Sequence, residues 1–125
     1  MKIEHIALNV EDPAAMAKWH CENFGMNVAS TNGVGWFVAD DAGHTLLEIY
    51  NNPDAPLPDY ASMDPLVLHL AFVSEDIEGD RARLLEAGCT PCGEPTTGPN
   101  GDAFAMLRDP WGLAIQLVNR STPLV

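Results

Sequence analysis

Basic residues are scarce in this chain, in which six lysines and arginines stand against 18 aspartates and glutamates. The resulting formal charge of −12 repels phosphate backbones and leaves no basic stripe to hold them, so we expect no nucleic-acid partner. The same scarcity argues against a strongly anionic substrate unless Arg83, Arg108 or Arg120 converge on it. The simplest role of the acidity is solubility.

Long apolar runs are also missing. No stretch approaches the roughly 18 residues that a membrane helix needs, and the N-terminus MKIEHIALNVEDP has no run of signal-peptide length. Cysteine is limited to Cys21, Cys89 and Cys92, without the spacing of a disulfide framework. We therefore expect no membrane association and a reducing, cytoplasmic location. Because the CTPC pair follows the end of a predicted helix, we interpret it as two small side chains at a strand edge, not as a redox or zinc motif.

With 46% hydrophobic residues, the 125-residue chain is long enough for one ordinary core, which predicts a single domain over residues 1–125. Within it, HIALNVED at 5–12 is nearly repeated as HLAFVSED at 69–76. Both copies open on a histidine and alternate between two faces in the manner of a half-buried strand. The strands are predicted over 2–10 and over 67–73, and Leu66 belongs to the apolar face of the second, which is predicted to pack on a helix.

Each of these strands is followed by helix signals. In the first copy, Asp12 is the predicted N-cap, Pro13 suits the first helical position and Gly25 ends the helix. In the second copy, Ser74 or Asp76 is the cap and Gly88 the stop. The spacing from histidine to glycine, 20 residues in one copy and 19 in the other, indicates an internal duplication.

Shorter extended runs complete each copy, at 26–30, 35–40 and 45–51 in the first half and at 93–97, 103–109 and 112–119 in the second. This order predicts an α+β fold in which two βαβββ modules form a curved mixed sheet. Module 1 spans about 1–52 and module 2 about 66–121. The connector, about 53–65, contains four prolines and suits an extended conformation.

Aligning the two final strands places Glu48 opposite Gln116. In all four histidine-bearing and final strands, the wholly apolar face is predicted to pack on the helices, so His5, Glu48, His69 and Gln116 point to the other side. There they converge if the halves pack about a pseudo-twofold axis. Two imidazoles with oxygen donors suit a borderline divalent cation and leave positions for water or substrate.

The alternative for each of these residues alone is a hydrogen-bonded strand side chain. The chain has two further histidines, His20 inside the first predicted helix and His44 in a turn, which have no partner in the repeat. We assign both a structural or solvent-exposed role.

The two modules with their histidine openings, the strand LLEIYN and the C-terminal RDPWGLAIQLV resemble the vicinal oxygen chelate superfamily. That superfamily includes glyoxalase I, methylmalonyl-CoA epimerase, fosfomycin-resistance thiol transferases, extradiol dioxygenases and bleomycin-resistance proteins. The resemblance covers residues 2–120 and implies the glyoxalase/bleomycin-resistance/dioxygenase fold. It also implies a divalent metal (nickel, cobalt, zinc, iron or manganese), chelation of neighbouring substrate oxygens, and the metal ligands His5, Glu48, His69 and Gln116.

Among these relatives, the chain looks most like short bacterial glyoxalase-like proteins, with two departures. Glyoxalase I and epimerase sites keep a carboxylate on the final strand, where this chain has Gln116, and the retained carboxylate is Glu48 in the other half. Glutathione-binding members carry a basic residue four positions after the first histidine, where this chain has Asn9. Asn52, four positions after Glu48, matches a substrate-side asparagine. Asn9 and Asn52 are therefore the expected substrate-binding residues.

The resemblance implies an enzyme of glyoxalase or epimerase type, similar to lactoylglutathione lyase, in which Glu48 is the catalytic base that abstracts a proton alpha to a carbonyl. One alternative is an extradiol-type dioxygenase or thiol transferase that uses two histidines and one carboxylate. Another alternative is a non-catalytic protein that sequesters a drug. The negative charge and the three tryptophans favour this alternative. The exposed edges of half-barrel sheets favour a homodimer, with module pairing either within one chain or across the two-fold axis.

Overall fold

The computed structural model describes residues 1–124, which form two compact units. The first unit is Met1–Pro58 and the second begins at Asp59, inside the proline-rich stretch 53–65. Among the described residues, the helices are too short and too polar to cross a membrane.

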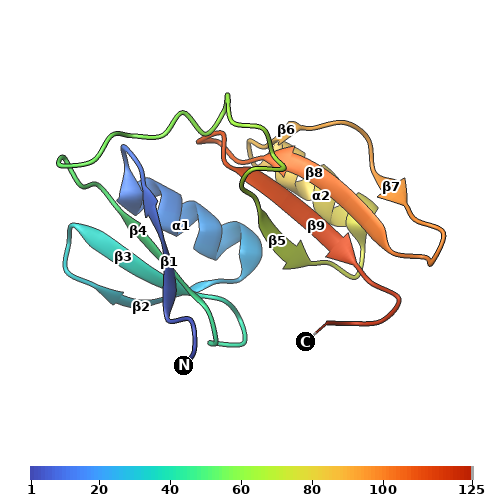
Figure 1. The fold of residues 1–125 in the computed structure, drawn as a ribbon, viewed down its shortest axis with the longest axis horizontal. Coiled ribbons are helices and arrows are strands. Elements are labelled where there is room, and N and C mark those ends of the chain that lie inside the picture. The colour runs from blue at the N-terminus through green and yellow to red at the C-terminus, as the bar shows by residue number, and fades with distance from the viewer. Residues whose placement is uncertain (125) are drawn as a thin grey trace. The chain divides into compact units, whose positions relative to one another are not determined.

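The first unit is a four-stranded mixed sheet with one helix packed on it (Figure 1). Its strand order is β1-β4-β3-β2, with β1 parallel to β4 and the other neighbours antiparallel. Because β1 and β4 are parallel, the chain has to cross back between them, and α1 lies on this crossover path. The elements are β1 (His5–Asn9), α1 (Pro13–Phe24), β2 (Asn27–Thr31), β3 (Gly35–Ala39) and β4 (Leu46–Tyr50).

The second unit repeats this arrangement (Figure 1). Its strand order is β5-β9-β8-β6, with β7 also pairing β8, and β5 is parallel to β9. The fold is therefore the predicted α+β arrangement of two related modules, each with one helix on one mixed sheet. The elements are β5 (Leu70–Val73), α2 (Ile77–Glu86), β6 (Thr90–Pro91), β7 (Thr96–Thr97), β8 (Ala103–Arg108) and β9 (Ala114–Asn119).

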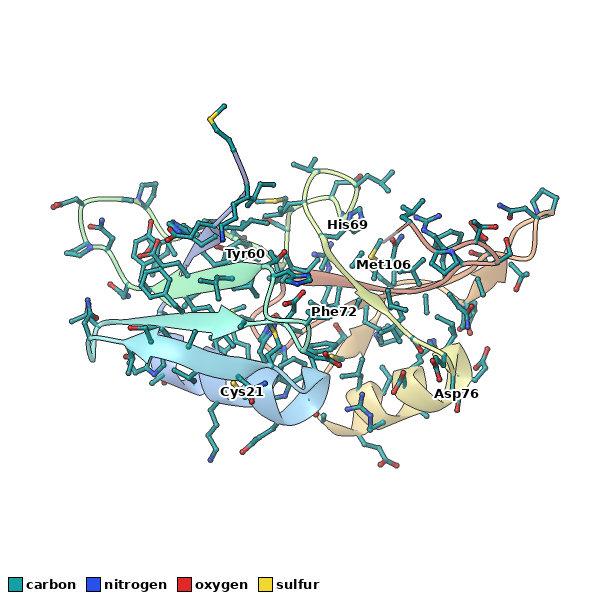
Figure 2. The ribbon with its side chains drawn as sticks, turned by 90° about the horizontal axis from the view of Figure 1, so that it is seen from below. Cys21, Tyr60, His69, Phe72, Asp76 and Met106 are labelled. Atoms are coloured by element: carbon teal, nitrogen blue, oxygen red, sulfur yellow. The ribbon has the colours of Figure 1, made fainter. Side chains whose placement is uncertain are left out.

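Both helices begin at the aspartate that the sequence indicates. Asp12 accepts a hydrogen bond from the Ala15 amide at 3.0 Å, and Asp76 accepts one from the Gly79 amide at 3.0 Å. Helix α1 ends at Gly25, whose φ of 65° favours glycine. Of the two candidate caps in the second copy, Asp76 is the N-cap (Figure 2).

Ser74 has a different role. Its hydroxyl donates to Asp80 Oδ2 at 2.7 Å and accepts from the Asp76 amide at 3.2 Å. The bond from the Ser74 hydroxyl is the main reason why the pKa of Asp80 lies below its usual range, and Arg83 adds to the effect. Ser74 thus braces the first turn of α2 from the side.

The predicted strand over 67–73 is shorter than expected. It begins only at Leu70, because Asp64 folds the preceding residues into a turn. The Asp64 carbonyl accepts from the Val67 amide at 2.9 Å, and the Asp64 carboxylate accepts from the Leu66 amide at 2.8 Å. Leu66 and Val67 consequently stay exposed, so the prediction that Leu66 packs on the helix is wrong.

The predicted strand over 93–97 is also different, because only its last two residues form a strand, β7, and another short strand, β6, precedes it at Thr90–Pro91. Between them Gly93 takes a positive φ of 76°, which turns the chain out of the extended conformation. Pro95 then lacks the amide hydrogen that a continuous strand pairing would use. Gly93 and Pro95 therefore interrupt the hydrogen-bonded pairing of this segment with β8.

Alternation along the strands separates two faces in each sheet. In β4, Leu47 and Ile49 are buried, and α1 packs on this part of the sheet. In β9, Ile115 and Leu117 are buried in the same manner, with α2 packed on β8 and β9. The residues between them in sequence, Glu48 among them, therefore lie on the face away from the helix in each unit.

Candidate metal-binding site

In the first unit, strand register brings His5 and Glu48 together. Ala7 is the register partner of Glu48, so His5 lies two residues away on the same face. His5 Nε2 is 3.3 Å from Glu48 Oε2, and both side chains are about one-third exposed, at 34% and 28%. The ring of Phe37 packs edge-on against the His5 ring, with centroids 5.7 Å apart. The pair is therefore held on a half-buried, partly aromatic surface.

The other ring nitrogen of His5 already has a partner. Its Nδ1 lies 2.9 Å from Glu4 Oε2, and an ionised carboxylate can only accept. Its Nε2 faces a second carboxylate, that of Glu48, so both ring nitrogens lie beside acceptor oxygens. A carboxylate that orients a histidine in this way is a common support of metal ligands.

In the second unit, the register is the same. Ala71 pairs with Gln116 as Ala7 pairs with Glu48, which makes Glu48 and Gln116 equivalent positions. His69 directly precedes β5, and Figure 2 shows it with Met106 on the side of the sheet away from α2. Met106 is the other register partner of Gln116, so Gln116 also lies on this side.

The His69 ring is oriented by a backbone carbonyl. Its Nδ1 is 2.8 Å from the Pro65 oxygen, which can only accept, so Nδ1 carries the proton and Nε2 holds the lone pair. In both sequence-predicted histidines, Nδ1 thus lies against an oxygen. The acceptor is a carboxylate in one unit and a carbonyl in the other.

Arg108 positions the segment that holds Pro65. Its guanidinium donates to the carbonyls of Tyr60 at 2.9 Å, Met63 at 2.8 Å and Gly112 at 3.0 Å. Three charge-assisted bonds tie the chain before β5 to the turn between β8 and β9. The sequence analysis did not identify Glu4 as a partner of His5 or Arg108 as a support of the segment before β5. The position of Glu4 next to His5 was an available signal. No sequence signal marks the contacts of Arg108, because its partners are backbone carbonyls.

The donor set fits half of a metal site in each unit. Each unit presents one imidazole Nε2 and, on the same face, one side-chain oxygen donor at an equivalent position, and these donor types suit borderline divalent ions. Within residues 1–124, no group of three or more His, Cys, Asp or Glu is arranged to hold a metal ion.

The two asparagines expected to bind substrate contact each other instead of standing apart. The Asn9 side chain is buried, and its oxygen accepts from the Asn52 amide at 2.8 Å. Its amide nitrogen lies 3.2–3.3 Å from the carbonyls of Asn52, Ala55 and Pro56. The Asn52 side chain accepts from the Asp54 amide at 3.0 Å. Both side chains shape the segment after β4.

The remaining candidate groups lie elsewhere. His20 is fully buried in α1, with its ring against Trp19 and Phe24, and His44 is in the exposed turn before β4. Cys89 and Cys92 flank β6 as free thiols. Burial, together with the nearby Asp109 charge, raises the pKa of Cys89 to about 12. Such a thiol is a poor nucleophile at neutral pH.

Comparisons with known proteins agree with this architecture. The crystal structure of a glyoxalase/bleomycin resistance protein from Albidiferax ferrireducens T118 is 21% identical, covers 94% of this chain and 98% of its own, and gives a TM-score of 0.67. A glyoxalase/bleomycin resistance protein/dioxygenase family enzyme from Burkholderia phytofirmans PsJN is 15% identical, covers 95% and 98%, and gives a TM-score of 0.78.

A third similar structure has a stated ligand class. TnmS3, an antibiotic binding protein from Streptomyces sp. CB03234, is 25% identical, with 97% of both chains covered and a TM-score of 0.70. Among curated proteins, none matches the chain. The sequence model named Glyoxalase/Bleomycin resistance protein/Dioxygenase superfamily matches residues 2–117. The chain therefore belongs to the glyoxalase/bleomycin resistance protein/dioxygenase superfamily.

Proposed function

We propose that the protein is a metal-dependent enzyme of glyoxalase or epimerase type that shifts a proton alpha to a carbonyl of a small substrate. The ligands in this proposal are His5, Glu48, His69 and Gln116. The single observation that carries it is that an oxygen lies against Nδ1 of both histidines, which leaves Nε2 as the nitrogen offered to a ligand, with Glu48 beside His5. Nickel, cobalt, zinc, iron and manganese are the candidate ions.

A divalent ion, when bound, supplies a Lewis acid for two neighbouring substrate oxygens. With Glu48 as the one carboxylate among the ligands, the site keeps a net positive charge, which favours negative charge on those oxygens. The protein's own groups supply the proton transfer. Glu48 Oε2 takes the proton from the carbon alpha to the carbonyl and returns it to the neighbouring carbon, so that the reaction is redox-neutral.

The first test is the metal content of the purified protein by elemental analysis. About one transition metal per chain is expected, with His5→Ala and His69→Ala each losing it, because each removes one imidazole from the set. His44→Ala is the matched control, since that histidine lies in an exposed turn. A wild-type protein that takes up no metal after reconstitution removes the proposal.

The proton transfer is tested with Glu48→Gln, which keeps the shape of the side chain and removes its basicity. Exchange of the alpha protons of dihydroxyacetone into D2O, followed by NMR, should be accelerated by the loaded wild type. It should fall by at least about 100-fold in the variant, in line with the loss of a general base. An unchanged rate excludes Glu48 as the base. Oxygen uptake with catechol after ferrous loading would instead indicate a dioxygenase.

A second candidate function is sequestration of a small molecule without turnover. The similarity to the antibiotic-binding TnmS3 favours it, as does the presence of only half a donor set in each described unit. Its distinguishing property is tight ligand binding by metal-free protein. Equal affinity of the wild type and the His5→Ala, His69→Ala double variant for a ligand would support the binder over the enzyme.

The proposal includes a homodimer in a reducing, cytoplasmic setting. Free thiols at Cys21, Cys89 and Cys92 suit a reducing compartment. Strand β5 is an edge of its sheet, and Val73 on it is exposed, which suits pairing with another module. Two chains would supply two copies of each half-site.

A further inference from the structure

One basic residue, Arg108, lies on the same face of the second sheet as Gln116. Its register partner Ala114 is two residues from Gln116, and Met106 lies between. The guanidinium is already used, because it donates three bonds of 2.8–3.0 Å to backbone carbonyls. Turning it toward a ligand would leave three part-buried acceptors without their charged donor, which is costly.

The guanidinium of Arg120 is committed in the same manner. It donates to Asp102 Oδ2 at 3.2 Å and lies 5.5 Å from the centroid of the Phe104 ring. Asp102 is buried, and the Ser121 amide bond, with smaller help from the Ser121 hydroxyl and from Arg120, lowers the pKa of its carboxyl. The carboxylate therefore stays ionised and keeps Arg120 neutralised beside Phe104.

Three further basic residues belong to the helices, which pack on the opposite face of each sheet. Each of them has a carboxylate within 4 Å: Lys18 with Glu22 at 3.7 Å, Arg81 with Glu94 at 3.6 Å, and Arg83 with Asp80 at 3.1 Å. The sixth is Lys2, in the stretch before β1. No lysine or arginine within the described strands other than Arg108 faces away from the helices.

The surroundings of the candidate ligands are aromatic and apolar. Phe37 and Glu48 are register partners, and Leu46 and Tyr50 flank Glu48 on the same face, all half-buried. On the face that carries Gln116, the neighbours are Phe104, Met106 and Val118. These side chains offer contact area to a ring or an alkyl group and no countercharge to an anion.

We infer that the ligand of this site carries no carboxylate or phosphate and is an aromatic or apolar molecule, neutral or cationic, with two neighbouring oxygens. The inference rests on the proposed function, because the neighbouring oxygens are what the ligand set would hold. Any net positive charge of the loaded site is taken up by these oxygens. A further anionic group would meet Glu48 and a chain of net charge −12, with the Arg108 guanidinium held by three backbone carbonyls and Arg120 paired with Asp102.

The test is calorimetric binding of three probes of equal chelating group to zinc-loaded protein: catechol, 3,4-dihydroxybenzoate and dopamine. Zinc is used because it is redox-inert. Each affinity is divided by the affinity of the same probe for free zinc, so that intrinsic chelation cancels. Catechol and dopamine should then exceed the carboxylate probe by about tenfold or more, a difference of about 1.4 kcal/mol.

A gain-of-charge variant makes the test specific to this face. Leu46→Lys places an ammonium beside Glu48 and should raise the relative affinity for 3,4-dihydroxybenzoate several-fold, with catechol little changed. The matched control is Val28→Lys. It makes the same change at an exposed position of β2, and its register partner Val38 is buried on the helix side.

The outcomes separate the two claims. Equal relative affinities for catechol and 3,4-dihydroxybenzoate overturn the inference and leave the proposed function standing. A preference for the carboxylate probe that disappears in Lys2→Gln overturns it as well, with Lys2 as the cation responsible. Zinc-loaded protein that binds none of the three probes removes the proposed function and the inference together.

Discussion

The buried Asn9 side chain contacts four backbone groups of the segment that follows β4, because its oxygen accepts from one amide and its amide nitrogen lies near three carbonyls. The bond from the Asn52 amide is the shortest, at 2.8 Å. Because this segment leads away from the strand that carries Glu48, Asn9 fixes how the chain leaves the His5 half-site. Its position four residues after His5 predicted a substrate contact, and that role stays a prediction.

We expect Asn9→Ala to lower the free energy of unfolding by about 2 kcal/mol, because the Asn52 amide and three carbonyls lose a part-buried partner. Urea unfolding measures this. Asn27→Ala is the control, since its one described side-chain bond is exposed and 3.4 Å long, and it should change stability by less than about 0.5 kcal/mol. An Asn9→Ala protein of wild-type stability with weakened ligand binding would instead support the substrate contact.

At the scale of secondary structure elements, the duplication is visible in the local chemistry. Asn51 donates to the carbonyls of Val10 and Glu11. In the second copy, Asn119 donates to the carbonyl of Glu75, which is the equivalent of Glu11. Each asparagine thus ties the end of a final strand to the entry of the helix. The sequence indicates these helices well, because caps and glycine stops act within a few residues.

We expect Asp12→Ala and Asp76→Ala each to cost about 1 kcal/mol of stability, since each removes the 3.0 Å bond to a first-turn amide. Asp12→Asn and Asp76→Asn keep an acceptor oxygen and should recover most of this loss. Thermal and urea unfolding by circular dichroism provide the measurement. Asp41→Ala, at an exposed loop position, is the control. Equal losses at Asp41 and at the two caps would show that the cost is general charge removal, not capping.

Strand ends were predicted less well than helix ends. Residues 67–69 alternate like the strand that follows, yet the Asp64 turn takes them out of the ladder. Alternation reports which side chains are apolar, but pairing depends on whether a neighbouring strand is present. In the second unit β9 pairs with β5 from Leu70 onward, and the chain before it is held by Arg108.

At the scale of the whole molecule, the proposed metal site takes one histidine and one oxygen donor from each unit. In the proposed homodimer, the two units of a site come either from one chain or from two chains. Mixing His5→Ala with His69→Ala distinguishes these arrangements after partial unfolding and refolding. Pairing across chains restores one intact site in each mixed dimer, because each variant supplies what the other lacks.

Pairing across chains predicts that the mixture recovers up to about one quarter of the wild-type metal per chain, because half of the dimers are mixed and each carries one intact site of two. Elemental analysis after gel filtration measures this, and each variant refolded alone is the control. No recovery in a mixture shown by mass spectrometry to contain mixed dimers places both half-sites within one chain.

The amino-acid pattern alone was sufficient for the duplicated modules, the helix caps and the equivalence of Glu48 with Gln116. Period-two alternation and capping are local, so a reader of the chain can follow them without knowing its path. The tertiary structure decided which atoms serve those positions. Arg108 reaches Tyr60, 48 residues away, and the Pro65 carbonyl sets the His69 tautomer. Such contacts join distant segments or backbone groups that every residue type carries, so no sequence pattern marks them.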